Sequence, residues 1–194
     1  MSSTNRGSSR EVSDYYVTPQ WAIREFLGTF VQVSDHGVQD LCAGTLDPCA
    51  GGSVAAGMAY PEALVEFGAP PDTILTIDIR DDSRADIKAD YLRWAPPADY
   101  KPWLIITNPP FSHAAEIAAK AIAEVEDGGF VVMLQRLNFL GTDCRREFWG
   151  RHRPKWVFVH RRRMRFNGAK STDSIEYAHF VWQRGHREEH RRRH

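Results

Sequence analysis

Apolar residues recur at two spacings along this chain, and stretches of the two kinds alternate. Spacings of three to four residues predict helices over residues 19–30, 53–67, 113–126 and 142–149, the second of them interrupted near Pro61. Short continuous apolar runs predict buried strands over residues 45–47, 73–79, 103–107, 130–134, 156–159 and 177–182. Such alternation is typical of parallel βαβ units in a doubly wound sheet with helices on both faces, and the last two strands can add an antiparallel edge hairpin. We therefore expect an α/β fold.

The length of 194 residues is enough for a single domain with one core. Residues 1–13 are rich in Ser, Arg and Gly and are predicted to form a disordered arm. Residues 14–184 are predicted to form the domain, and residues 185–194 a mobile basic tail. Three scattered cysteines suit neither a disulfide framework nor a zinc site, so no metal is expected. The polar N-terminus does not resemble a signal peptide, and no apolar run approaches the roughly 20 residues that span a bilayer. We expect a cytoplasmic protein with no membrane contact.

The formal net charge is zero, but the charges are divided along the chain. Residues 1–144 hold 10 basic and 20 acidic side chains, whereas residues 145–194 hold 15 basic and 5 acidic ones. Within the second segment, residues 151–170 contain eight basic side chains and no acid, interleaved with aromatic residues. Such a segment is typical of a surface that contacts nucleic acid, although it can also be a solvated loop. The neutral sum therefore does not exclude a polyanionic partner.

A glycine turn, Asp47-Pro-Cys-Ala-Gly-Gly-Ser53, stands between a predicted strand and a predicted helix. Such junctions are where ligands bind in doubly wound sheets, and glycine lets the backbone come close to a ligand. Asp78 ends the next strong strand, where a carboxylate can accept hydrogen bonds from both ribose hydroxyls. The turn lacks both the phosphate-loop and the GxGxxG patterns. Together these features indicate a nucleoside site, with a plain turn and a capping acid as the structural alternatives.

The tetrad Asn108-Pro109-Pro110-Phe111 follows the buried run that ends at Thr107, on the same predicted sheet edge as the glycine turn. Two prolines remove backbone donors and fix the chain, so rigid carbonyls remain. The Asn108 side-chain oxygen and the Pro109 carbonyl can accept both hydrogens of a planar amino group, while Phe111 stacks on the ring that carries it. This drawing of the hydrogens frees the nitrogen lone pair for attack. A proline turn that merely stops the strand is the structural alternative.

These motifs, in this order, resemble the S-adenosylmethionine-dependent amino-methyltransferases that act on the exocyclic nitrogen of adenine. Residues 14–19 with Trp21 resemble the N-terminal cofactor motif of the same enzymes, and residues 163–182 are similar to the closing segment of the small phage-type, Dam-like DNA N6-adenine methyltransferases. The resemblance covers about residues 14–183. It implies a Rossmann-like class I methyltransferase fold, S-adenosylmethionine as cofactor, and no strong general base, because the sulfonium is already an excellent leaving group.

The resemblance also implies roles for individual residues. Those at the methionine end of the cofactor precede the first predicted strand: Tyr15, Thr18 and Pro19. Those around its amino acid group lie in the glycine turn: Asp47, Pro48, Ala50 and Gly51. Those around its ribose and adenine follow the next strand: Asp78, Ile79 and Asp90. Asp86 competes with Asp90 for the adenine amine, and Asp90 can instead be a helix cap or turn acid.

DNA, double-stranded by preference, is the expected partner. The residues expected to contact it are Arg136, Asn138, Arg161, Arg162, Arg163, Arg165 and Lys170. They fall in two loops, residues 136–154 and 161–174, and not in a separate recognition domain. We therefore expect short or relaxed sequence specificity and a mainly electrostatic affinity. If the chain is encoded by a phage, it would work in the cytoplasm of the bacterial host, in restriction evasion or regulation.

Two other functions stay open at this stage. Tetrads of this type also serve RNA amines and protein glutamine side chains, although Phe111 and the basic segment favour a nucleic acid. A non-catalytic DNA-binding module with a vestigial cofactor pocket is less favoured, because a binder would need none of Asn108, Asp47 and Asp78.

Overall fold

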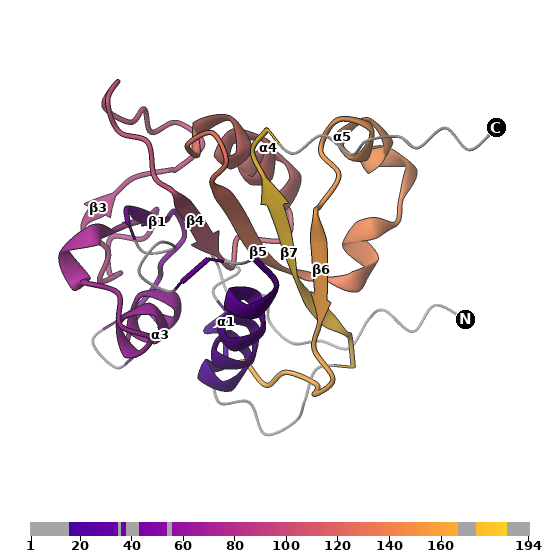
Figure 1. The fold of residues 1–194 in the computed structure, drawn as a ribbon, viewed down its shortest axis with the longest axis horizontal. Helices are drawn as coiled ribbons and strands as arrows, with labels where there is room; N and C mark the ends of the chain where they lie inside the picture. Colours follow the sequence, from indigo (N-terminus) through magenta and orange to yellow (C-terminus); the bar gives the residue numbers. More distant parts are fainter. Residues whose placement is uncertain (1–15, 35, 38–42, 54–55, 167–173, 186–194) are drawn as a thin grey trace.

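A computed structural model describes residues 16–34, 36–37, 43–53, 56–166 and 174–185. The predicted arm, and all but the first residue of the predicted tail, lie outside this range. The described residues form a seven-stranded sheet in the order β3-β2-β1-β4-β5-β7-β6 (Figure 1). Its strands are β1 (Thr45–Asp47), β2 (Ile74–Asp78), β3 (Ile87–Lys88), β4 (Leu104–Thr107), β5 (Phe130–Arg136), β6 (Trp156–Val159) and β7 (Tyr177–Gln183).

Strand directions confirm the predicted mostly parallel sheet with an antiparallel edge. Neighbouring strands from β3 through β5 all pair in parallel, whereas β7 is antiparallel to both β5 and β6. The first strand in the chain, β1, lies between β2 and β4. The sheet therefore grows in one direction from β1 to β3 and in the other from β4 onward. The carboxyl ends of β1 and β4 flank this switch point, which is where doubly wound sheets bind ligands.

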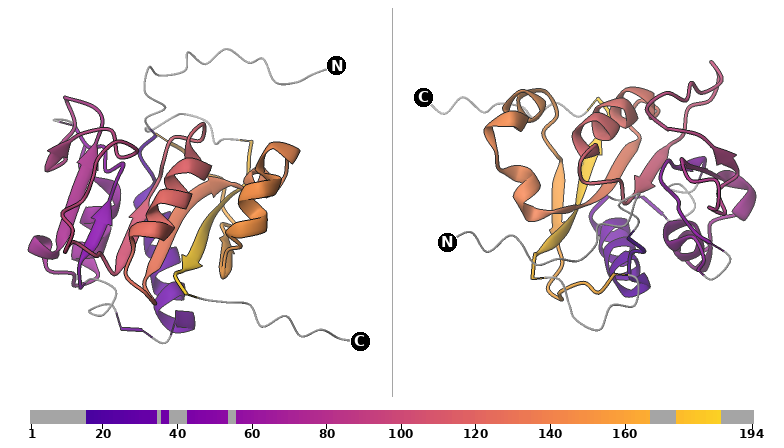
Figure 2. Two further views of the ribbon diagram at one scale, coloured as in Figure 1. Left: turned by 90° about the horizontal axis from the view of Figure 1, so that it is seen from above. Right: turned by 180° about the vertical axis from the view of Figure 1, so that it is seen from behind.

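Helices cover both faces of the sheet. They are α1 (Gln20–Ser34), α3 (Ala59–Glu66), α4 (Ala114–Glu124) and α5 (Arg146–Arg151). Helices α1 and α3 lie on one face, and α4 and α5 lie on the other (Figures 1 and 2). No helix among the described residues combines the length and apolarity needed to cross a bilayer.

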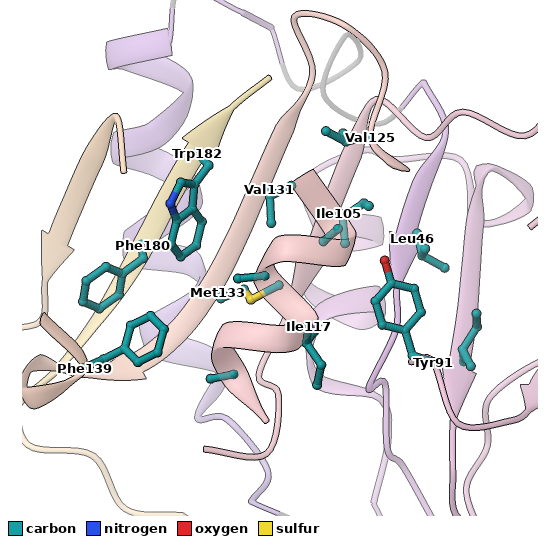
Figure 3. Packing of buried hydrophobic residues seen from close by; sticks show 14 of the residues in the cluster. Leu46, Tyr91, Ile105, Ile117, Val125, Val131, Met133, Phe139, Phe180 and Trp182 are labelled. Carbon is teal, nitrogen blue, oxygen red and sulfur yellow. The ribbon is translucent and has the colours of Figure 1, made fainter. Parts of the chain in front are cut away.

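Alternation along the strands divides the core between the two faces. In β4, Leu104 and Ile106 belong to the cluster under α1 and α3, whereas Ile105 belongs to the cluster under α4. Figure 3 shows this second cluster, with α4, which carries Ile117, lying over the strands that carry Ile105 and Met133. A strand buried on both faces reads as a continuous apolar run, which is why the sequence reveals these strands so directly.

The main differences between the predicted and the observed elements concern α3, β3 and α5. Helix α3 begins only at Ala59, so Pro61 lies in its first turn, where the missing N–H has no helical partner to lose, and causes no interruption. Strand β3, of two residues, was not predicted because so short a segment shows no apolar run. The predicted helix over residues 142–149 is a 3₁₀ turn, Asp143–Arg145, followed by α5.

The described part of the basic segment, residues 151–166, is divided between the two ends of the sheet. Strand β6 runs parallel to β5, because each is antiparallel to β7. Residues that precede β6 therefore lie at the amino edge, and Lys155 Nζ donates to Gln183 Oε1 at the end of β7. Residues that follow β6, from His160 to Phe166, begin at the carboxyl edge. Arg136, the last residue of β5, pairs with Tyr177 at this edge. The single charged surface suggested by the sequence is thus two surfaces.

Candidate active site

A pocket of about 190 Å³ opens at the switch point between β1 and β4. The predicted residues that line it are Thr18, Pro48, Ala50, Asp78, Ile79, Asp90, Asn108 and Pro110. The lining residues that were not predicted are Tyr16, Val17, Cys49, Gly57, Ala59, Tyr60, Arg80, Tyr91, Leu92, His113 and Ile117. Pro19, Asp47, Gly51, Pro109 and Phe111 are not among the lining residues. Tyr15 falls outside the described residues.

The glycine turn is fastened to Asp78. Gly51 N–H donates to Asp78 Oδ2 at 2.8 Å, and Arg80 N–H donates to Asp78 Oδ1 at 2.9 Å. Gly51 and Gly52 have φ of 63° and 76°, and a Cβ on Gly52 would lie 2.8 Å from Met58 Cγ. Only glycine takes this left-handed conformation without strain. One carboxylate thereby joins the loops that follow β1 and β2, and it still lines the pocket.

Asp47 lies beneath the pocket and does not border it. Its side chain is 1% exposed, and Oδ1 accepts from Cys49 N–H at 3.2 Å. Burial, together with the nearby charge of Asp78, raises the pKa of Asp47 to about 7. Asp47 is thus buried next to the turn that carries Ala50 and Gly51, and its expected contact with the amino acid group of a cofactor stays a prediction.

Asp86 and Asp90, the two candidates for the adenine amine, lie in different surroundings. Asp86 Oδ2 accepts from Thr76 N–H at 3.0 Å and from Thr76 Oγ1–H at 2.6 Å, so it joins the loop to β2 away from the pocket. Asp90 lines the pocket, and its Oδ1 accepts from Leu92 N–H at 3.0 Å. It is therefore a turn acid and a pocket residue at once. Ile79 stands beside this wall and is 64% exposed, a large apolar surface facing open space.

Asn108 has a fixed orientation at the end of β4. Its side-chain Nδ2 donates to the Tyr16 carbonyl at 2.9 Å. Because only the amide nitrogen can donate to a carbonyl, Oδ1 must face the other way and can accept a hydrogen bond. Tyr16 thus orients Asn108 through its backbone, a contact between residues 92 positions apart. Pro110 and Asn108 both border the pocket.

The ring of Phe111 lies behind the pocket among other aromatic rings. Tyr16 stacks on it at a centroid distance of 6.0 Å and 25°, and Tyr177 lies at 6.0 Å and 41°. The Arg136 guanidinium sits over the Phe111 ring, with Cζ 4.4 Å from its centroid. Phe166 closes the group through edge contacts with Tyr16 and Tyr177.

Tyr60, a residue that the sequence did not single out, ends a buried chain of hydrogen bonds. Its hydroxyl lies 2.9 Å from His179 Nε2, and His179 Nδ1 lies 2.7 Å from His160 Nε2. Burial lowers the pKa of both imidazoles, so both are neutral near pH 7. His160 Nδ1 faces Glu25 Oε2 at 3.8 Å, which favours a proton on that nitrogen and so sets each donor in the chain toward Glu25. The chain fixes one wall of the pocket.

The predicted DNA-contacting residues lie at the same edge as the pocket. Arg136 ends β5 and Asn138 is exposed in the following 3₁₀ turn, Leu137–Leu140. The arginines that follow β6 are all exposed: Arg161, Arg162, Arg163 and Arg165. Some have partners, since Arg161 pairs with Glu25 at 3.4 Å and Arg163 with Glu176 at 3.7 Å. Lys170 lies outside the described residues.

No protein-family model and no curated protein sequence matches this chain. A candidate RNA methyltransferase from Pyrococcus horikoshii is similar in structure, with 14% identity, a TM-score of 0.63 and 94% of each chain covered. The type IIG restriction endonuclease BpuSI has a TM-score of 0.64 at 14% identity, over 89% of this chain and 26% of its own. An S-adenosylmethionine-dependent O-methyltransferase from Thermotoga maritima has a TM-score of 0.53 at 12% identity, over 86% and 66%. The chain thus has the Rossmann-like fold of class I methyltransferases.

Proposed function

We propose that this chain transfers a methyl group from S-adenosylmethionine to the exocyclic N6 amine of a flipped-out adenine in DNA. The observation that carries the proposal is the orientation of Asn108. Its amide nitrogen is engaged by the Tyr16 carbonyl, so its oxygen is presented as an acceptor at the end of β4, beside the pocket. A planar amine with two hydrogens is the ligand that suits such an acceptor next to a rigid Pro109 carbonyl.

The pocket fits the proposed cofactor in three respects. Asp78 can accept from ribose hydroxyls while its backbone donors hold it still. Asp90 can accept from an adenine amine, and the exposed side chain of Ile79 can cover an adenine ring. Thr18, Pro48 and Ala50 surround the end of the pocket near the glycine turn. When bound there, S-adenosylmethionine supplies an electrophilic methyl group on a sulfonium.

The residues of the tetrad are proposed to hold and orient the amine that receives the methyl group. Asn108 Oδ1 and the Pro109 carbonyl accept the two amine hydrogens, which draws the nitrogen toward tetrahedral geometry and frees its lone pair. The amine nitrogen held by Asn108 and Pro109 would form the new bond to the methyl group as the sulfonium leaves as a neutral thioether, and the amine would then release one proton to solvent. Holding the two reactants in line provides most of the acceleration, so no side chain is needed as a strong base.

DNA is the proposed polymer because the exposed arginines after β6 lie at the same edge of the sheet as the pocket. Their positive charges can contact the phosphates of a bound strand. Affinity is expected to be mainly electrostatic, with short or relaxed sequence specificity, since the exposed segments beside the pocket are two loops. The phage-type, Dam-like relationship is part of this proposal. RNA is the second candidate, because the candidate RNA methyltransferase from Pyrococcus horikoshii matches over 94% of both chains.

A tritium-transfer assay with labelled S-adenosylmethionine tests the proposal. Duplex DNA, single-stranded DNA, RNA of the same sequence and a glutamine-containing peptide would be offered separately. We expect label in DNA, located at N6 of adenine after digestion to nucleosides. Label in RNA alone would select the second candidate, and label in none would contradict both. Expression in a host that lacks adenine methylation, with mapping of modified adenines at base resolution, would then give the recognition site.

A further inference from the structure

The aromatic ring expected to stack on the target base, Phe111, has a side chain of the protein itself over one face. Arg136 Cζ lies 4.4 Å from the centroid of the Phe111 ring, over its face. Asn108 and Pro110 border the pocket, but Phe111 and Arg136 do not. The part of the site that would bind the cofactor is thus a pocket, whereas a guanidinium covers a face of the ring that is expected to stack on the base.

The guanidinium is held there by aromatic groups. Arg136 Nε donates to the Tyr177 hydroxyl at 3.3 Å, across the antiparallel register that pairs these two residues. None of the ion pairs within the described residues involves Arg136. A guanidinium is planar and delocalised, has a weak hydration shell and stacks readily on rings. It therefore resembles a nucleobase in shape and in its preference for an aromatic face.

We propose that Arg136 occupies the stacking position of the target base in the protein without DNA, and that a flipped base displaces it. This inference rests on the proposed function. Stacking of a cation on a ring and stacking of a base on a ring are similar in strength, so the exchange alone is nearly balanced. The displaced guanidinium, at the same edge as Arg165, can then pair with a phosphate of the bound strand.

The exchange would make the site selective for a base within a polynucleotide. A free nucleoside must displace Arg136 and offers no phosphate to receive it, so it binds poorly. A base in DNA displaces the same side chain and brings phosphates with it. Arg136 is therefore a positioning residue that favours polymer over nucleoside. A purely structural Arg136, which merely holds Phe111 and Tyr177 together, would strengthen binding of both ligands.

Two variants separate these roles: Arg136→Ala uncovers the Phe111 ring, and Arg136→Lys keeps the charge but loses the planar group. The dissociation constant of deoxyadenosine would be measured by calorimetry with saturating S-adenosylhomocysteine, and that of a 20-base-pair duplex at several salt concentrations. For Arg136→Ala we expect deoxyadenosine to bind about three- to tenfold tighter. Duplex DNA should bind more weakly, with the log–log salt slope reduced by about one. Arg136→Lys should also bind deoxyadenosine tighter while keeping the slope.

Deoxyadenosine affinity that is unchanged or weaker in a folded Arg136→Ala protein would overturn the inference. If the alanine variant does not fold, the lysine variant decides by the same measurement. Failure of the proposed function is seen elsewhere, in a wild-type protein that transfers no methyl group to nucleic acid. Failure of this inference would be seen when the deoxyadenosine affinities of the Arg136 variants are compared with that of a wild-type protein that does transfer methyl groups.

Discussion

On the β1–β2–β3 side of the switch point, Asp78 and Asp90 border the pocket among mostly apolar side chains. On the β4–β5–β7 side, Tyr177 and the Arg136 guanidinium lie against the ring of Phe111. Hydrogen bonds from backbone N–H groups to carboxylates fix the first side. One example is the bond from Gly51 N–H to Asp78 Oδ2, at 2.8 Å. The second side is held by contacts between side chains, which can be exchanged for contacts with a ligand.

The difference indicates two modes of binding at one edge. A carboxylate tied to two backbone N–H groups cannot move without breaking both turns, so the cofactor side is preformed. A stacked arginine can leave its ring by rotating its own side chain, so the base side can open when a ligand compensates for the lost contact. Variants on the two sides should therefore affect different measured quantities.

Asn108→Ala is expected to have the largest effect, on turnover. Loss of the Oδ1 acceptor removes one of the two groups proposed to hold the amine, and removal of one such group typically lowers kcat by about 100- to 1,000-fold. Tritium transfer to DNA would measure this. Cofactor affinity, measured by calorimetry, should change little because Asn108, which borders the pocket, is assigned to the amine of the base and to no group of the cofactor. Retained transfer would contradict the assigned role of Asn108.

Asp78→Asn is expected to weaken cofactor binding by about 10- to 100-fold, since hydrogen bonds to a charged group contribute about 1.5–3 kcal/mol. Asp82→Asn is the matched control, because Asp82 lies four residues further along, pairs with Arg80 and has a side chain that is 73% exposed. Calorimetry with S-adenosylhomocysteine would compare the two. Equal losses in both variants would mean that the effect comes from the loop and not from the pocket.

Asp78 and Asn108 can be located from the sequence because each stands at the carboxyl end of a buried strand, Asp78 as its last residue and Asn108 just after it. A continuous apolar run fixes where a parallel strand ends, and the carboxyl ends of parallel strands share one edge. Motifs that each end a parallel strand are therefore expected to lie close together in space, although they are far apart in the sequence. The same reasoning could not choose between Asp86 and Asp90, since the choice depends on which acid Thr76 engages.

Contacts that depend on antiparallel register or on several elements escape such reasoning. Arg136 and Tyr177 are 41 residues apart and meet only because β7 pairs with β5 in one register. The chain from Tyr60 through His179 to Glu25 draws on α3, β7 and α1, and each residue alone reads as an ordinary helix or strand residue. The division of the basic segment likewise follows from the direction of β6, which no local pattern encodes.

Arg165→Ala should lower DNA affinity several-fold and reduce the log–log salt slope by about one, because Arg165 is exposed at the carboxyl edge. Arg151→Ala is the control from the same basic segment, since Arg151 lies before β6 and pairs with Glu147. Its slope should equal that of the wild-type protein. Fluorescence anisotropy of a labelled duplex at four salt concentrations would measure both. Equal slopes for the two variants would mean that DNA does not distinguish the two edges.

Asp47→Asn is expected to have the smallest effect on ligand binding, within about twofold for the cofactor, because Asp47 lies under the glycine turn and asparagine has nearly its shape. Its effect on stability should instead depend on pH. Burial raises the pKa of Asp47 from 3.8 to about 7, so between these values the folded protein holds a proton that the unfolded chain has released.

The free energy of unfolding contributed by Asp47 is therefore fully present below pH 3.8 and is lost as pH rises toward 7. Asparagine carries no such proton, so Asp47→Asn should match the wild-type protein near pH 4 and exceed its stability at pH 8. Urea titrations at both pH values would measure the gap, and other titrating groups cancel because both proteins share them. If the difference in the free energy of unfolding between the two proteins does not grow with pH, Asp47 is charged in the folded protein throughout this range. That charge would need a cation beside it, and Asp47 would then belong with Asp78 as a direct part of the cofactor side.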